Sequence, residues 1–189
     1  MTPQATRHSI LLLLLLFLST SATLAQRDVA AYIQRYDSVA VDIMLRHQVP
    51  ASLVLALAIH ESGAGTSRLS REQCNHFGLK GKRVTSKKKP APPSKKHLEF
   101  ETDEASFQHF AELVTRKKFY DKLKGNPDPV VWLKALKKAG YAASPHWVPR
   151  VSALIRKHQL TTYDRPLAEL MKSNTPEPDS LESSLPPLP

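Results

Sequence analysis

The architecture of this chain follows from one segment, Pro50-Ala-Ser-Leu-Val-Leu-Ala-Leu-Ala-Ile-His-Glu-Ser-Gly-Ala-Gly-Thr-Ser67. Its first ten residues are apolar nearly all round, which predicts a helix buried in the centre of a domain. Pro50 is well placed to open that helix, and Gly63 is well placed to end it. Glu61 then lies in the last turn, on the face that Leu57 occupies. The segment predicts a carboxyl group at the end of a buried helix.

Glu61 is the first candidate for chemistry. Its apolar surroundings and the negative end of the helix dipole both oppose ionisation. We therefore expect Glu61 to hold a proton near neutral pH, as a general acid must. The residues alone leave catalysis and a satisfied buried acid equally open. A zinc-binding His-Glu-x-x-His helix does not fit, because Ala64 stands where the second histidine would be. We expect neither a metal nor a cofactor.

The N-terminus has the pattern of a secretory signal peptide over residues 1–25. A basic start at Arg7 precedes an apolar run over residues 10–18, and Thr23-Leu-Ala25 is a small-residue cleavage motif. An uncleaved anchor is the alternative, although the run is short for a membrane span. The pattern predicts export across the inner membrane to the periplasm or the cell exterior, without a stable membrane anchor.

The rest of the chain has the size of one domain, which we place at residues 26–164. A proline-rich tail over residues 165–189 is expected to be disordered. The net charge of +10 falls to +9 without residues 1–25, which contain one arginine and no acid. Such basicity favours an anionic partner, such as a cell-wall polymer, a membrane surface or nucleic acid. Cys74 is the only cysteine, so no intrachain disulfide can form.

Helices are predicted for most of this domain. Apolar residues at spacings of three and four predict a first helix from about Asp28 to His47. Further helices are predicted to open near Thr102 or Asp103, at Asp128-Pro129 and after Ser144-Pro145. Residues 80–97 are rich in lysine, contain no acid and include three prolines, which predicts a loop or a poor hairpin. No aromatic residues alternate with these lysines, so nucleic acid is not expected as a partner.

Cys74 and His76 raise the question of a nucleophile pair. Two residues apart, they point roughly the same way only in an extended segment. A third group that would orient the histidine is not evident from the sequence. A small, partly buried cysteine is the simpler interpretation.

Four segments, in this order, resemble the bacterial glucosaminidase family, glycoside hydrolase family 73, which is mannosyl-glycoprotein endo-beta-N-acetylglucosaminidase-like. They are Ala56-Leu-Ala-Ile-His-Glu-Ser-Gly-Ala-Gly-Thr-Ser67, Asn75-His-Phe-Gly-Leu-Lys-Gly81, Ala105-Ser-Phe-Gln-His-Phe110 and Lys138-Ala-Gly-Tyr-Ala-Ala-Ser-Pro-His-Trp147. The likeness extends over about residues 30–164 and is greatest to the versions found in Bacteroidetes. It implies an α+β, mostly α-helical, lysozyme-like fold with a small, flexible β-lobe.

The resemblance also implies an activity and a set of roles. Family members cleave the β-1,4 bond after N-acetylglucosamine in peptidoglycan or related glycans, and this chain would do so as a monomer. Glu61 would be the general acid that protonates the leaving oxygen. Tyr141 would line the cleft near the reacting carbon, and Asn75, Phe77 and Trp147 would shape the sugar subsites.

One departure from the family concerns the second carboxylate. Family members usually carry an acid on the β-lobe, where this chain has the acid-free residues 80–97. Glu99 and Glu101 are the first acids that follow. Either could reach the cleft, or the N-acetyl group of the substrate could assist with Tyr141. Two alternatives to a hydrolase are a non-catalytic wall-binding module and a lytic transglycosylase-like enzyme that needs one acid.

Overall fold

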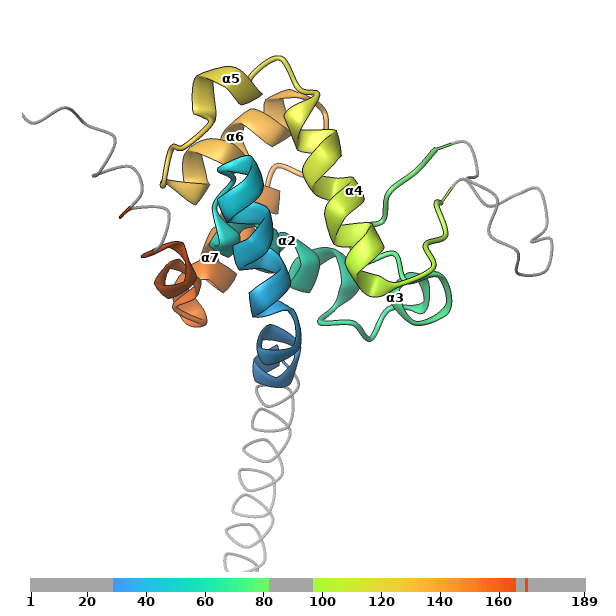
Figure 1. Cartoon of the computed structure of the whole chain (residues 1–189). Coiled ribbons are helices and arrows are strands. Elements are labelled where there is room, and N and C mark those ends of the chain that lie inside the picture. Colours follow the sequence, from blue (N-terminus) through green and yellow to red (C-terminus); the bar gives the residue numbers. More distant parts are fainter. Residues whose placement is uncertain (1–28, 82–96, 166–168, 170–189) are drawn as a thin grey trace, which may run out of the picture.

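The computed structural model describes residues 29–81, 97–165 and 169. The predicted signal peptide, nearly all of the predicted tail, and residues 82–96 of the basic segment lie outside the described residues. The described part consists of helices packed around one central helix, α2 (Figure 1). The mostly helical character predicted from the sequence is therefore confirmed.

The central helix, α2 (Ala51–Ser62), is buried along nearly its whole length. Every residue from Ala51 to Ile59 is buried, as its apolar sequence predicts. Burying one Leu or Ile side chain contributes about 1.5–3 kcal/mol, so removing this helix from water is a main driving force of the fold. Pro50 is the N-cap, and Gly63 ends the helix in the left-handed conformation with φ of 59°. Both predicted helix ends are confirmed.

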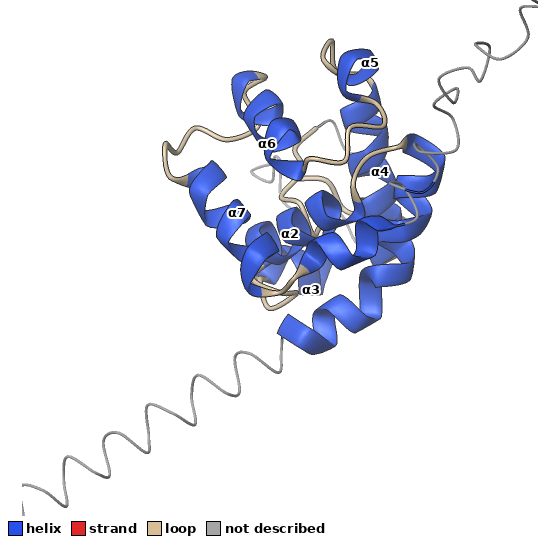
Figure 2. Cartoon of the chain, turned by 90° about the vertical axis from the view of Figure 1, so that its left-hand side faces the viewer, coloured by secondary structure: helices blue, strands red, loops and turns tan. Residues whose placement is uncertain are grey.

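The other helices cover α2 from several sides. In chain order they are a first helix (residues 29–47), α3 (Arg68–Gln73), α4 (Asp103–Thr115), α5 (Tyr120–Leu123), α6 (Pro129–Lys138), α7 (Trp147–Lys157) and the 3-10 helix η1 (Leu160–Asp164). Helices α6, α7 and η1 pack directly on α2. Figure 2 shows that α6 and α7 run on the same side of α2. The short elements α3, α5 and η1 were not predicted, because four to six residues give too weak an apolar period.

The predicted starts of α4 and α6 are confirmed by their caps. The Thr102 side chain accepts a hydrogen bond from the Ala105 N–H, and the Asp128 side chain accepts one from the Val130 N–H. A capping oxygen satisfies an N–H that has no partner within its own helix. Each cap therefore fixes where the following helix begins.

Strand pairing is minimal in the described residues. It consists of a single antiparallel bridge between Lys80 and His97, beside a hydrogen bond of 2.8 Å from the Leu98 N–H to the Leu79 carbonyl. The bridge joins the two flanks of the basic segment. A β-lobe of the predicted kind is not seen there, because residues 82–96, which would build most of it, are not described. Separately, the helices of the described part include none that is long and apolar enough to cross a membrane.

Asp164 links the end of the domain to the start of α2. Its side chain is buried, and Oδ1 accepts a hydrogen bond of 2.9 Å from the Ser52 N–H in the first turn of α2. Burial raises the pKa of Asp164, while hydrogen bonds from Ser52 and Ala51 oppose the rise. The Asp164 carboxyl group thus satisfies an N–H in the first turn of α2 from 112 positions away in the sequence.

Replacing Asp164 by Asn should make the protein less sensitive to pH. Because the folded-state pKa of Asp164 is raised, its contribution to stability is present below the unfolded pKa of about 4 and is lost as pH rises through the folded value. Asp164→Asn keeps the acceptor oxygen and has no charge to bury. Urea unfolding at pH 4 and pH 7 should show the variant gaining stability relative to wild type at the higher pH.

Asp164→Ala is the control, because it removes the acceptor as well as the charge. It should be about 1–2 kcal/mol less stable than Asp164→Asn at both pH values, because only the acceptor oxygen distinguishes the two variants. If Asp164→Asn and wild type had the same dependence on pH, the argument about the buried charge would be wrong.

Candidate active site

Glu61 is held by an indole N–H from the far end of the domain. Its side chain is half-buried in the last turn of α2, and Oε1 accepts a hydrogen bond of 2.8 Å from Trp147 Nε1. Trp147 is the first residue of α7 and is only 4% exposed. The two residues are 86 positions apart in the chain. The carboxyl group therefore has one oxygen fixed by a buried donor while part of the side chain remains accessible.

Tyr141 lies in the connection between α6 and α7, next to Trp147. The two ring centroids are 5.5 Å apart, and the Tyr141 ring also meets Phe110 edge-on at 6.0 Å. The Tyr141 hydroxyl lies 3.4 Å from the Phe77 carbonyl oxygen, to which it donates. Burial raises the pKa of Tyr141 well above its ordinary value, and the charge of Glu61 acts in the same direction. The phenol is therefore neutral and remains a hydrogen-bond donor.

The α6–α7 connection is anchored so that Tyr141 and Trp147 come together. The Tyr141 N–H bonds to the Leu136 carbonyl at 3.0 Å, which ties the connection to the end of α6. Further along, the Ser144 carbonyl accepts from Lys137 Nζ at 2.6 Å and from the Trp147 N–H at 3.3 Å. The family resemblance predicts the two aromatic residues but not these anchors.

Asn75 supports the backbone beside the site. It is 1% exposed, its Nδ2 donates to the carbonyls of Leu79 and Leu98, and its Oδ1 accepts from the Leu79 N–H. These bonds occupy the amide on both sides and join the two flanks of the basic segment. The structure therefore buries Asn75, with its side-chain amide taken up by backbone groups.

Phe77 lies in the hydrophobic core. It is 3% exposed, stacks on Phe110 with ring centroids 4.3 Å apart, and meets Phe107 edge-on at 5.0 Å. Its backbone carbonyl, not its ring, is the part that contacts Tyr141. Phe77 thus supports the site by placing that carbonyl.

Glu99 and Glu101 lie together on the segment that leads from the Lys80–His97 bridge to α4. Glu99 is half-buried and Glu101 is exposed. Between them, the Phe100 N–H bonds to the Gln73 carbonyl at 2.9 Å, which fixes this segment against the end of α3. The structure brings Glu61, Trp147 and Tyr141 into direct contact or charge interaction, and it places the two further acids on the segment that precedes α4.

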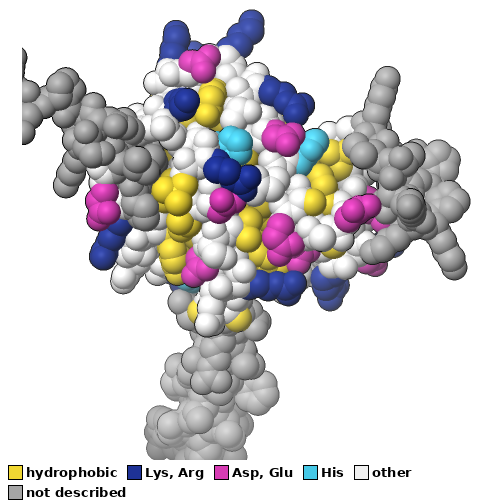
Figure 3. All heavy atoms as spheres, in the orientation of Figure 1, with side chains coloured by type: hydrophobic (Ala, Val, Ile, Leu, Met, Phe, Trp, Pro, Cys, Tyr) yellow, Lys and Arg dark blue, Asp and Glu magenta, His cyan; other side chains and the backbone are white. Residues whose placement is uncertain are grey.

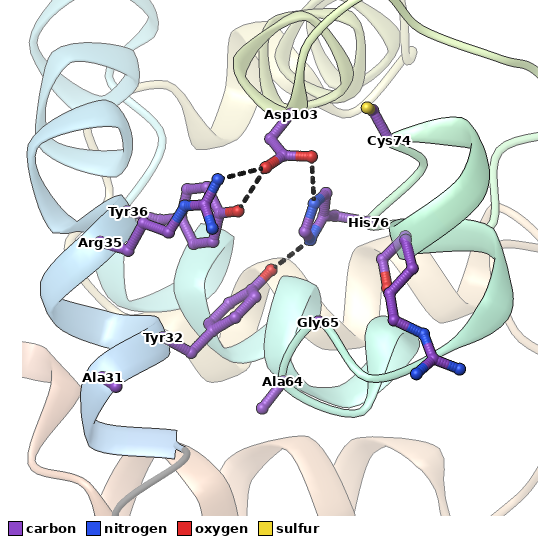
Figure 4. A pocket seen from close by; sticks show the side chains of 11 residues that line it. Ala31, Tyr32, Arg35, Tyr36, Ala64, Gly65, Cys74, His76 and Asp103 are labelled. Atoms are coloured by element: carbon purple, nitrogen blue, oxygen red, sulfur yellow. Dashed lines mark hydrogen bonds and ion pairs between the residues drawn. The ribbon is translucent and has the colours of Figure 1, made fainter.

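A second polar cluster, which sequence reasoning missed, lies beside the turn that carries Ala64 and Gly65 (Figure 4). The Tyr32 hydroxyl lies 2.7 Å from His76 Nδ1, and His76 Nε2 lies 3.0 Å from Asp103 Oδ1. Although burial opposes the ionisation of Asp103, hydrogen bonds from Tyr36 and His76 lower its pKa. His76 thus has the orienting acid that the sequence could not reveal, but its other nitrogen meets Tyr32, not Cys74. The one available signal was the pair of tyrosines one helical turn apart.

The family model for mannosyl-glycoprotein endo-beta-N-acetylglucosaminidase (Glucosaminidase) matches residues 37–160. This chain belongs to the glucosaminidase family. The matched region contains Glu61, Tyr141 and Trp147. The family predicted from the four sequence segments is thereby confirmed.

The relatives of this glucosaminidase-family chain include a curated enzyme and several solved structures. Exo-glucosaminidase LytG of Bacillus subtilis is 29% identical over 134 residues, which cover 63% of this chain and 48% of LytG. This chain thus spans about half the length of that relative.

Among solved structures, the catalytic domain of the autolysin Auto from Listeria monocytogenes has a TM-score of 0.57 at 21% identity, over 72% of this chain and 88% of that one. The glycoside hydrolase domain of FlgJ from Salmonella typhimurium has a TM-score of 0.54 at 23% identity, over 77% and 96%. These likenesses establish the fold.

The hydrogen bond between Trp147 and Glu61 should be measurable as a coupling energy. We expect a double-mutant cycle of Trp147→Phe and Glu61→Ala, followed by urea unfolding, to give a coupling of about 1 kcal/mol, because the hydrogen bond between the two side chains is lost only once. Trp132 offers a matched control: it is fully buried, and its Nε1 donates to the Asn126 carbonyl at 2.9 Å. Trp132→Phe and Glu61→Ala should be additive, and equal coupling in both cycles would contradict the assignment.

Proposed function

We propose that this protein is an exported peptidoglycan hydrolase that cleaves the β-1,4 bond after N-acetylglucosamine, with Glu61 as general acid. The observation that carries the proposal is the contact of Glu61 with Trp147 beside a neutral Tyr141, inside the region that matches the glucosaminidase family. The LytG relative is an exo-glucosaminidase, which supports cleavage next to N-acetylglucosamine. The predicted signal peptide would direct export, and its removal after Ala25 would leave the mature enzyme at the cell wall.

The geometry suggests how the reaction would proceed. Protonated Glu61 gives its proton to the leaving glycosidic oxygen as the bond to the sugar breaks. The Trp147 N–H then stabilises the carboxylate that is left, since hydrogen bonds to ions are stronger than those to neutral groups. The oxygen of the substrate's N-acetyl group attacks the reacting carbon, and the oxygen lone pairs of the Tyr141 hydroxyl, whose hydrogen is donated to Phe77, stabilise the positive charge that develops there. Water finally opens the ring so formed, and its proton returns to Glu61.

The charge distribution suits an anionic wall polymer. Residues 116–157 contain eleven Lys and Arg residues against two acids. Many of these cations are exposed, and Figure 3 shows Lys and Arg side chains around the end of the molecule formed by α5 and α6. Peptidoglycan carries carboxylates on its peptides, so such a surface would raise its local concentration.

Glu61→Gln should reduce the clearing of purified peptidoglycan at least about 100-fold, because the amide has no proton to give. The matched control is Glu72→Gln in α3, an exposed glutamate whose partner is Arg68 at 2.8 Å. That variant should retain wild-type activity. Full activity of Glu61→Gln would show that Glu61 is not the general acid.

The products separate the proposed hydrolase from its two alternatives. Mature protein would be mixed with peptidoglycan and the released fragments analysed by mass spectrometry. Reducing N-acetylglucosamine ends are expected. Anhydromuramic ends would instead indicate a lytic transglycosylase-like reaction, and no release would indicate a wall-binding module.

Glu99 and Glu101 test whether a second carboxylate takes part. We expect Glu101→Gln to stay within about twofold of wild type, because its side chain is exposed ahead of α4. Glu99→Gln is the sharper variant. Assistance by the substrate predicts a loss of less than about 10-fold, and a loss of about 100-fold or more would identify Glu99 as the second acid.

A further inference from the structure

The turn that follows Glu61 lies on Tyr32. Residues 63–66 fold back after α2, with Gly65 at φ of 79°. A Cβ atom on Gly65 would come within 3.1 Å of the Tyr32 ring, so the two are in tight contact. Ser62, the residue after Glu61, donates to the Ala58 carbonyl at 2.6 Å and accepts from the Gly65 N–H at 2.8 Å. Its Oγ is also 3.5 Å from the Tyr32 hydroxyl oxygen. The end of α2 and its turn therefore rest on one tyrosine.

Tyr32 is itself held by a chain of buried polar groups. Its hydroxyl meets His76 Nδ1 at 2.7 Å, and His76 Nε2 lies 3.0 Å from Asp103 Oδ1. His76 is 2% exposed and Tyr32 is 6% exposed. In the neutral tautomer that fits these contacts, Nε2–H faces the carboxylate and Nδ1 accepts from the tyrosine. The Tyr32 hydroxyl hydrogen therefore points to His76 Nδ1.

Two further residues fix Asp103 at the end of this chain. Asp103 Oδ2 accepts from the Tyr36 hydroxyl at 2.6 Å and from Arg35 at 3.0 Å. Buried polar groups are costly when unpaired, so these contacts together favour one arrangement of the group. The chain joins the first helix, the segment that carries His76, and the first turn of α4 (Figure 4).

The Tyr32–His76–Asp103 group does not include the contact between Glu61 and Trp147. It borders a separate cavity of about 510 Å³, whose lining includes Arg71 and Ala64 but not Glu61, Tyr141 or Trp147. Its residues are therefore suited to hold the turn, not to touch a sugar bound at Glu61. They would act on the reaction only through the position of α2's last turn.

We propose that Tyr32, His76 and Asp103 are positioning residues that aim the Glu61 carboxyl group by fixing the turn after it. This inference rests on the proposed function for its effect on turnover. Its effect on the Trp147–Glu61 contact can be measured without any activity. The positioning role and the proposed function can therefore be disproved separately.

The test is Tyr32→Phe, with Tyr36→Phe as matched control. Both tyrosines are buried on the first helix, one turn apart, and both hydroxyls bond to members of the same chain. Only Tyr32 also touches Ser62 and Gly65. If the Tyr32–His76–Asp103 contacts served stability alone, the two variants would behave alike. If it positions Glu61, only Tyr32→Phe will disturb the site.

The first readout is the indole N–H resonances of the two tryptophans in a 1H–15N spectrum, assigned with Trp147→Phe and Trp132→Phe. Tyr32→Phe should move the Trp147 resonance, whose proton is donated to Glu61, and leave that of Trp132 in place. Tyr36→Phe should move neither. An unmoved Trp147 resonance in Tyr32→Phe, or an equal shift in both variants, overturns the proposal.

The second readout is the kinetics of glycan cleavage. Tyr32→Phe should lower kcat about 10-fold with KM within about twofold, because the acid is misplaced while the sugar subsites are intact. Equal kcat losses in both tyrosine variants would count against positioning. An inactive wild type would sink the proposed function, while the resonances would still decide the positioning role. Should Tyr32→Phe not fold, Ser62→Ala removes the hydroxyl that contacts Tyr32 and the Gly65 N–H. This variant is expected to move the Trp147 resonance.

Discussion

The structure depends on the burial of α2. A helix with no polar face can be stable in water only if other elements cover it on all sides, and α6, α7, η1 and the preceding helix do so. This requirement determines where the chain can be polar. The cover ends at the last turn of α2, where Glu61 is half-buried and a single indole N–H reaches it. The site thus lies at the end of α2 that the surrounding helices leave partly exposed.

Polar groups in the interior hold the surroundings of Glu61 in place. Asp164 caps the start of α2, Asn75 joins the two flanks of the basic segment, and the Tyr32–His76–Asp103 chain supports the turn after Glu61. A buried polar group that loses its partner costs about 1–3 kcal/mol, so each of these contacts favours one backbone arrangement over its alternatives. With a single cysteine and therefore no internal disulfide, rigidity at the site must come from such contacts and from packing.

The chemistry available at the site is that of one carboxyl group, one buried indole and one neutral phenol. Burial and the neighbouring charge of Glu61 keep Tyr141 protonated, which suits it to donate and not to act as a base. Glycoside hydrolysis ordinarily uses two carboxylates, and residues 80–98 contain none. The proposed assistance by the substrate's own N-acetyl group would need no second carboxylate from the protein.

The sequence by itself determined the central helix, its two ends, the caps of α4 and α6 and the choice of Glu61, because apolar period, proline, glycine and capping residues act over a few neighbouring positions. It also identified Tyr141 and Trp147, through their likeness to a family. Only the tertiary structure decided what those residues touch: Trp147 meets Glu61 across 86 positions, Phe77 turns into the core, and Tyr32 meets His76 across 44. Contacts of that separation depend on how whole helices pack, and no local pattern encodes the direction in which a side chain will then point.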